Sequence, residues 1–380
     1  MALLVLLPIA VVVWLAFTPT ENIWPHLWNT VLPRYATNTL IVMVCVGLGT
    51  CTLGTLLAYV VTHCLFPGRA WIQYALLAPL AVPGYVGAYA LVDFLEYAGP
   101  VQTGLRHIFG WQTSRDYWFP EIRSMGSAVF VLTVTLYPYV YLLARASFRA
   151  LPASGQDVAR SMGLSPLQQF WRVAFPLARP GIVAGTAVVM METVNDFGTV
   201  EFFAVQTLTT GIFSVWLESY NAGGAAQLAL CILAVIALLA SLEKISRRQG
   251  QFARTARQVA SIAPRAIQSG AWGLTALCIT PIVLGFVAPT IILTVRSIGA
   301  EMAHGFYTAL FNSITLGAIT AVITMTCAFL LVHGLRQQRG TRGQILLRFT
   351  ALGYAIPGAV LGLGVLIPFA ALDRTIATGW

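Results

Sequence analysis

Nine long apolar runs dominate this sequence, and no water-soluble fold can bury so many of them. A helix needs about 20 mainly apolar residues to cross the hydrocarbon core of a membrane. Because the runs are continuous rather than alternating, they predict spanning helices and not the strands of a membrane barrel. We therefore predict an all-α polytopic membrane protein with about nine transmembrane helices, near residues 2–17, 36–64, 71–92, 127–144, 181–200, 225–242, 270–295, 309–334 and 346–371.

Composition supports this class. Hydrophobic residues make up 58% of the 380 residues and charged residues only 9%, whereas a soluble domain carries about 25% charged residues. The chain has too little polar surface for a soluble globule, and too much apolar surface for a disordered segment.

Residues that would support catalysis are scarce. The single lysine, Lys244, lies between Glu243 and Ile245, so the sequence lacks the Gly-Lys-Ser/Thr that a nucleotide-binding P-loop needs. The six cysteines form no Cys-x-x-Cys pair, and the five histidines are scattered without metal-ligand spacing. We predict a transport subunit and not an enzyme, with no cofactor and with any ATP hydrolysis on a separate chain.

Basic residues indicate the orientation. With a cytoplasmic N-terminus, 16 of the 22 Lys and Arg residues fall on the cytoplasmic side of nine alternating spans, as the positive-inside rule expects. Anionic lipid of the bilayer is a sufficient partner for this charge, so the basic balance implies no nucleic acid. We predict a multi-pass protein of the bacterial inner (plasma) membrane with its N-terminus in the cytoplasm.

The sequence repeats itself at one constant shift. Residues 38–40 (Asn-Thr-Leu) match residues 312–314 (Asn-Ser-Ile), and at the same shift residues 81–84 (Ala-Val-Pro-Gly) match residues 355–358 (Ala-Ile-Pro-Gly). Six spans separate the copies, so both units have the same orientation, as parallel repeats do.

The repeat predicts three parts. Residues 1–243 form a first unit of six helices, residues 244–264 form a polar and basic cytoplasmic linker, and residues 265–380 form a second unit of three helices. We expect this second unit to be incomplete at its C-terminal end.

The predicted cytoplasmic loop 150–180 contains two short helices. Ser154 with Asp157 and Ser165 with Gln168 have the spacing of capping boxes, which mark helix starts. Gly163 lies where the first helix ends, a position that favours a left-handed residue.

Pro176 is predicted to end the second helix. An apolar stripe runs along this element and needs a surface to bury it. It packs either on the protein's own helix ends or in a groove on a cytoplasmic partner, and it comprises Leu164, Leu167, Phe170, Trp171 and Ala174.

This loop resembles the cytoplasmic motif of type I ABC-importer permeases, Glu-Ala-Ala-x3-Gly-x9-Ile-x-Leu-Pro. The residues at the motif positions are Asp157, Val158, Ala159, Gly163, Val173, Phe175 and Pro176. The resemblance implies the type I permease fold and a coupling helix that fits a cleft on a dimeric cytoplasmic ABC ATPase. The residues that it implies for coupling are Asp157, Ala159, Gly163, Leu164, Leu167, Phe170 and Pro176.

Three further segments, residues 79–85, 116–124 and 191–200, resemble the fused two-unit permeases of bacterial iron(III) importers. The resemblance implies ATP-driven import of ferric iron, taken from a periplasmic substrate-binding protein, by alternating access. Two alternatives stay open: the same machinery for polyamine, thiamine or an oxyanion, and a secondary transporter that needs no ATPase.

Carboxylates near the predicted spans are candidates for the translocation path. Glu192 and Asp196 are four residues apart, on one helical face at the end of the fifth run. Charged groups at such depth are costly and are usually functional, and oxygen ligands suit hard cations. This pair either lies at the outer boundary of the membrane in contact with water, or lines the path and coordinates metal transiently; Asp93 and Glu96 are further path candidates.

Proline and glycine interrupt the third and ninth runs. Pro83 with Gly84, and Pro357 with Gly358, stand at matching positions of the repeat. Such breaks release backbone carbonyls and let a membrane helix bend. They predict a kink, or a hinge that lines the path between the units.

Overall fold

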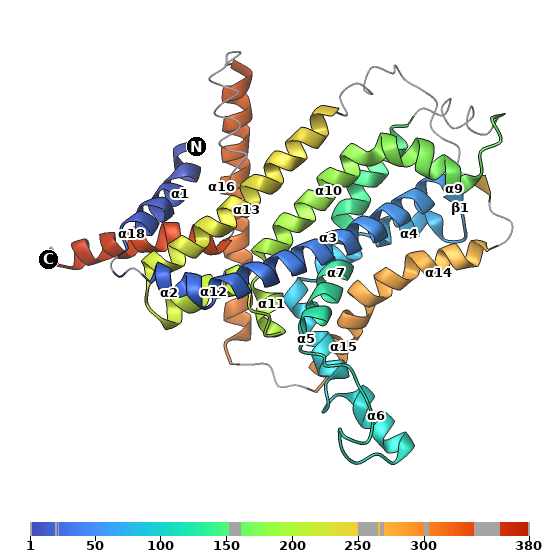
Figure 1. Ribbon diagram of the computed structural model, residues 1–380, viewed down its shortest axis with the longest axis horizontal. Coiled ribbons are helices and arrows are strands. Elements are labelled where there is room, and N and C mark those ends of the chain that lie inside the picture. Colours follow the sequence, from blue (N-terminus) through green and yellow to red (C-terminus); the bar gives the residue numbers. More distant parts are fainter. Residues whose placement is uncertain are drawn as a thin grey trace. The chain divides into compact units, whose positions relative to one another are not determined.

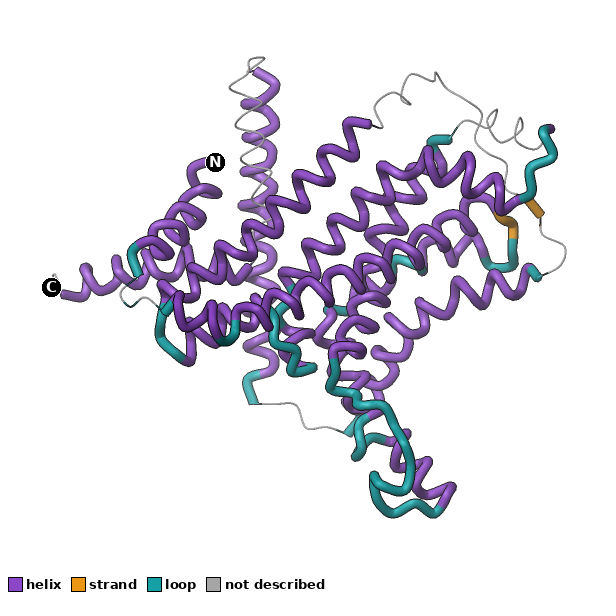
Figure 2. The backbone as a smooth tube through the Cα atoms, viewed as in Figure 1, coloured by secondary structure: helices purple, strands orange, loops and turns teal. Residues whose placement is uncertain are grey.

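The computed structural model describes residues 2–19, 21, 23–151, 161–249, 265–266, 270–299, 304–337 and 358–378. The described chain is built almost entirely of helices (Figures 1 and 2). In chain order the elements are α1 (Ala2–Phe17), α2 (Trp24–Asn29), α3 (Leu32–His63), β1 (Cys64–Leu65), α4 (Arg69–Ala75), η1 (Ala78–Ala81), α5 (Gly84–Leu95), α6 (Pro100–Phe109), α7 (Met125–Arg149), α9 (Pro166–Gln169), η2 (Phe170–Ala174), α10 (Phe175–Asn195), α11 (Gly198–Phe202), α12 (Leu208–Phe213), η3 (Ser214–Glu218), α13 (Ala222–Gln249), β2 (Arg265–Ala266), α14 (Ala271–Ile282), η5 (Val283–Val287), α15 (Ala288–Ser297), α16 (Phe306–Gln337) and α18 (Gly358–Thr378).

The chain forms two compact units, and each is described by itself. The larger unit comprises residues 25–211 and 234–293, and the smaller unit comprises residues 1–24, 212–233 and 294–380. These units follow spatial contact, whereas the predicted division into residues 1–243, 244–264 and 265–380 follows the repeat. That division stays a prediction.

Three helices form the core of the larger unit: α3, α7 and α10 pack against one another along their lengths. Each presents one buried apolar face to the other two, as amphipathic packing requires. The fully or almost fully buried side chains of this core include Val42, Val46, Leu57, Tyr137, Val140, Tyr141, Ala178, Ile182 and Val189.

Glycines bring these three backbones close together at Val140 of α7. A Cβ atom added at Gly54 of α3 would lie 2.8 Å from the Val140 Cβ, and one added at Gly185 of α10 would lie 2.8 Å from the Val140 Cα. Small residues at helix crossings allow the close van der Waals packing that drives helix association in lipid. The smallest side chains therefore stand where three helices meet.

One helix start follows the sequence repeat. Helix α16 (Phe306–Gln337) begins at the position that the repeat pairs with the start of α3 (Leu32–His63). The matching sequence segments therefore begin helices at matching positions.

Six helices among the described residues are long and apolar enough to cross a membrane: Leu32–His63, Met125–Arg149, Pro166–Asn195, Ala222–Glu243, Ala271–Ser297 and Phe306–Gly334. A bent pair makes a seventh if it counts as one span. The first predicted run corresponds to α1 and the ninth overlaps α18, whose apolar stretches among the described residues are Leu7–Phe17 and Val360–Ala370. The all-α polytopic class is confirmed, and the number nine stays a prediction.

The third predicted run is broken. Residues 69–81 and 84–109 meet at an angle of 87°, and Pro83 stands in extended conformation directly before α5. Proline lacks the N–H that a continuing helix needs and disfavours a helical residue before it, so the break falls at Val82-Pro83.

The prediction that Pro176 ends its helix is wrong. Residues 166–195 form one continuous helical span, and Pro176 follows a π-helical turn at Phe170–Ala174. A proline ring clashes with the carbonyl four residues earlier, here that of Arg172, and the wider π turn moves this carbonyl aside. Pro289 follows the π turn Val283–Val287 at the same spacing.

In the smaller unit, α1 packs against α18. The first part of α13 is tied to the N-terminal segment, because Gln227 Nε2 donates to the Ala16 carbonyl (3.2 Å) and Asn221 Nδ2 donates to the Glu21 carbonyl (3.3 Å). These bonds join segments that lie far apart in the sequence.

A Gly→Ala substitution should have opposite effects on stability at Gly185, where the added methyl group meets Val140, and at Gly104, where it meets open space. Gly185→Ala should lower the free energy of unfolding by roughly 1–3 kcal/mol, because the added methyl group meets the α7 backbone. Gly104→Ala in α6 meets no atom within 4 Å and should stabilise by up to about 1 kcal/mol through helix propensity. Thermal unfolding of the two purified variants in one detergent checks this, and equal shifts would contradict it.

Candidate functional site

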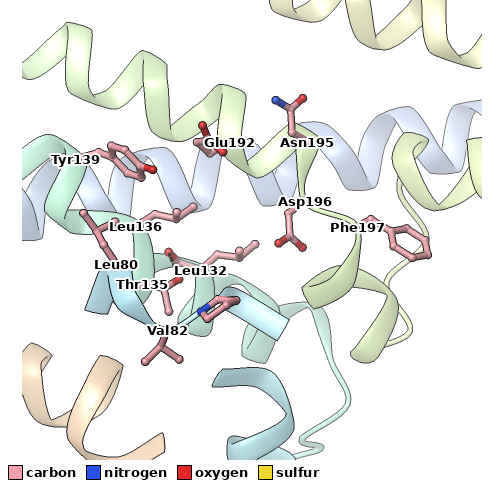
Figure 3. Close-up of a pocket in the computed structure, with 12 residues that line it drawn as sticks. Leu80, Val82, Leu132, Thr135, Leu136, Tyr139, Glu192, Asn195, Asp196 and Phe197 are labelled. Atoms are coloured by element: carbon pink, nitrogen blue, oxygen red, sulfur yellow. Dashed lines mark hydrogen bonds between the residues drawn. The ribbon is translucent and has the colours of Figure 1, made fainter. Parts of the chain in front are cut away.

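A cavity of about 340 Å³ lies in the larger unit beside the break before α5. Four segments that are distant in the sequence surround it: the end of η1, the start of α5, the middle of α7 and the end of α10 (Figure 3). Its lining residues are Leu80, Val82, Pro83, Gly84, Leu132, Thr135, Leu136, Tyr139, Glu192, Asn195, Asp196 and Phe197. The structure thus brings the predicted pair Glu192 and Asp196 to the predicted break at Pro83 and Gly84.

The absence of a side chain at Gly84 lets two helix starts approach each other. A Cβ atom at this position would lie 2.5 Å from the Thr199 hydroxyl oxygen of α11 and 3.5 Å from Asp196 Oδ2. Gly84 therefore allows the start of α5 to lie directly against the start of α11 at the edge of the cavity.

Asp196 organises the turn between α10 and α11. Its Oδ1 accepts hydrogen bonds from the backbone N–H groups of Thr199 (2.9 Å) and Val200 (3.2 Å). Its Oδ2 accepts a bond from the Thr199 hydroxyl (2.9 Å). A carboxylate at a helix start satisfies N–H groups that have no partner within the helix, so part of the role of Asp196 is structural.

Glu192 enters the cavity from the last turns of α10, across from Tyr139 of α7 (Figure 3). Both side chains line the cavity. The Asn195 side chain points away from the Asp196 carboxylate, on the other side of the chain (Figure 3). Glu192 therefore presents the second carboxylate to the cavity, beside a phenolic hydroxyl.

The charge of the lining has one sign. Among the described residues that line the cavity are two carboxylates and no Lys, Arg or His, so this lining disfavours anions and favours cations. In the described part of the chain, no three His, Cys, Asp or Glu side chains come together as a metal-binding group. The cavity has the chemistry of a weak cation contact rather than of a closed metal cage.

The other path candidates lie elsewhere. Glu96, just after α5, pairs with Arg123 (Oε1 to Nε, 3.0 Å) and lines a different cavity of about 420 Å³ among the residues around α6. Asp93 lies in α5, half-buried, and lines neither cavity. Their place on a translocation path stays a prediction.

The predicted coupling loop is described in part. Asp157 and Ala159 lie outside the described residues, as does Pro357 of the second predicted break, whereas Gly358 begins α18. Gly163 has a φ of 74°, the left-handed conformation expected at a helix end. Ser165 forms the predicted capping box with Gln168 at the start of α9.

The apolar stripe of this loop divides between two environments. Phe170 packs edge-on against Tyr59 of α3, with ring centroids 4.8 Å apart, and Ala174 is buried. In contrast, Leu167 is 68% exposed and Trp171 is 57% exposed, while Leu164 is half-buried. One side anchors the element to the larger unit, and the other side remains on the surface.

Sequence reasoning missed the contribution of α7 to the cavity. Thr135 and Tyr139 are polar residues one helical turn apart within an apolar run, and this spacing was the available signal. Nothing in the sequence indicates that they face Glu192, because that depends on how α7 packs against α10.

Comparison with known proteins gives one family match over about half of the chain. The model of the family described as binding-protein-dependent transport system inner membrane component matches residues 51–249. The matched region runs from α3 to α13 and contains the cavity and the described part of the cytoplasmic loop.

Individual relatives are similar at low sequence identity. The Fe(3+)-transport system permease protein FbpB 2 of Haemophilus influenzae is 26% identical over 351 residues, which cover 88% of this chain and 63% of that protein. The molybdenum transport system permease protein ModB of Escherichia coli is 27% identical over 52% of this chain and 86% of its own length. A solved bacterial alginate ABC transporter structure has a TM-score of 0.49 at 16% identity, covering 60% of this chain and 83% of that one.

The bonds of Asp196 predict a graded effect of substitution. Asp196→Ala removes the side-chain acceptor of the Thr199 and Val200 N–H groups and should lower the free energy of unfolding by about 1 kcal/mol. Asp196→Asn keeps one carbonyl acceptor and should lose less. Thermal unfolding of both variants in the same detergent tests this, and equal losses would show that Asp196 does not cap α11.

Proposed function

Because the chain belongs to the family of binding-protein-dependent transport system inner membrane components, we propose that it is the permease subunit of an ATP-driven importer. In this proposal a periplasmic binding protein delivers the cargo, and a separate cytoplasmic ABC ATPase dimer drives alternating access. The permease itself makes and breaks no covalent bond. We further propose that its N-terminus is cytoplasmic, as the distribution of Lys and Arg indicates.

The observation that carries this proposal is the divided stripe of residues 164–174. Phe170 and Ala174 hold the element on α3 and its neighbours, while Leu167 and Trp171 stay exposed. A rigidly held element with exposed apolar side chains suits a groove on a partner. Movement of such a partner would then be transmitted along the continuous helix 166–195 to Glu192 at its far end.

Loss of the exposed contact should uncouple the partner. We expect Leu167→Asp to weaken binding of the co-expressed ATPase subunit about tenfold or more, because it places a charge at a buried apolar anchor. The matched control is Ile108→Asp in α6, which is 74% exposed and should bind normally.

The measurement is co-purification of the ATPase with each variant. Equal retention of the ATPase by both variants would place its docking surface elsewhere. If no ATPase co-purifies with the unsubstituted chain, the alternative of an ATPase-independent secondary transporter replaces the proposal.

For the cargo we propose ferric iron. The relatives carry names that refer to iron(III), molybdenum and sulfate, so their names alone do not choose among these cargoes. The lining of the cavity supports a cation, because its described residues include Glu192 and Asp196 and no basic residue. Carboxylate and phenolic oxygens are hard ligands that suit Fe³⁺, and the negative charge of the two carboxylates repels an oxyanion.

Uptake measurements distinguish these cargoes. In vesicles that contain the permease with its ATPase and binding protein, Glu192→Gln should reduce iron uptake about tenfold while keeping the shape of the side chain. Glu201→Gln, on the exposed side of α11 and outside the cavity, is the matched control. Uptake of molybdate or sulfate in place of iron would reject the iron proposal but would leave the permease proposal intact.

A further inference from the structure

Three arginines stand at the start of α4 and in the last turns of α7, two helices that are joined through Gln73. Arg69 begins α4, and Arg145 and Arg149 lie in the last turns of α7. Arg145 and Arg149 both act electrostatically on Arg69. In the described part of the chain none of the three forms an ion pair, whereas Arg123 pairs with Glu96. This arginine cluster therefore concentrates positive charge without a described counter-charge.

Protein contacts hold two of these side chains in place. Arg69 Nε donates to the Val61 carbonyl (2.6 Å), one of the carbonyls that a helix C-terminus leaves unpaired. Arg145 donates from a terminal nitrogen to the Gln73 side-chain oxygen. Because Tyr141 also donates to the Gln73 carbonyl (2.8 Å), α4 and α7 are joined through one residue.

Arg145 is the member of the cluster whose burial costs free energy of folding. Its residue is only 8% exposed, and its Nε is buried without a hydrogen-bond partner among the described residues. Two tyrosine rings, of Tyr74 and Tyr141, lie 5.8 Å from its guanidinium carbon and give only weak compensation. A buried charge without an opposite charge is strongly unfavourable, so an anion nearby would stabilise the folded state.

Donors remain available for such an anion. Within the described residues the terminal nitrogens of Arg69 and the guanidinium of Arg149 donate to no protein acceptor, and Arg149 is exposed. On the same short helix as Arg69, Trp71 is 56% exposed and Tyr74 is 64% exposed, while Ile72 between them is buried. Exposed Trp and Tyr are typical of the membrane interface.

We propose that the arginine cluster is a binding site for the phosphate group of an anionic phospholipid. Arg69 and Arg149 donate to the phosphate, and Arg145 adds its buried charge. Trp71 and Tyr74 then lie at the interface beside the lipid glycerol and acyl chains. Basic pockets between spanning helices bind acidic headgroups in this way. The site rests on the described contacts; its assignment to the cytoplasmic leaflet rests on the proposed orientation.

The test uses the whole chain in detergent with cardiolipin as the probe. Cardiolipin should raise the melting temperature, and native mass spectrometry should show bound lipid. Arg149→Gln should weaken the apparent affinity about fivefold, and adding Arg69→Gln should weaken it about fivefold again. Arg149 is the primary variant, because Arg69 also holds the end of α3.

Arg179→Gln is the matched control. Arg179 is an exposed arginine of α10, and its variant should bind cardiolipin as the unsubstituted chain does. Equal weakening by Arg179→Gln would show general attraction to the charged surface and overturn the site. Equal stabilisation by inorganic phosphate at the same concentration would make it a free-phosphate site and overturn the lipid. If the variant that combines Arg149→Gln with Arg69→Gln kept its affinity for cardiolipin, the arginine cluster would be neither a lipid site nor a phosphate site.

Discussion

The close approach of three helix backbones at Val140 is the constraint on which the larger unit depends. Gly54 and Gly185 bring α3 and α10 against the same turn of α7. In lipid there is no hydrophobic force between helices, so such packing supplies much of the association energy. It also fixes which side chains of α7 and α10 face one another.

The cavity follows from this packing together with a single broken helix. Once α7 and α10 are aligned, Tyr139 and Glu192 lie on the same side. The break at Val82-Pro83 then directs α5 away at 87° and leaves the space that these residues line. Asp196 also accepts hydrogen bonds from Thr199 at the start of α11. Its carboxylate therefore stabilises this turn and lines the cavity at the same time.

Local signals were predicted well, and for a clear reason. The capping box at Ser165, the left-handed Gly163 and the break at Pro83 depend on residues within one or two turns, which the sequence displays directly. Pro176 shows the limit of local reasoning. A proline normally ends a helix, but a preceding π turn removed the clash and let the helix continue to Asn195.

The sequence by itself determined the class of this protein, because a run of some 20 apolar residues has no stable place other than a membrane or a core. It also determined the repeat, whose copies begin the helices α3 and α16 at matching positions. Only the tertiary structure decided which polar groups meet. Glu192 and Tyr139 line one cavity, Glu96 pairs with Arg123, and Arg145 is buried beside Gln73. These residues come from different helices and loops. They are brought together by helix packing, which no short segment of the sequence encodes.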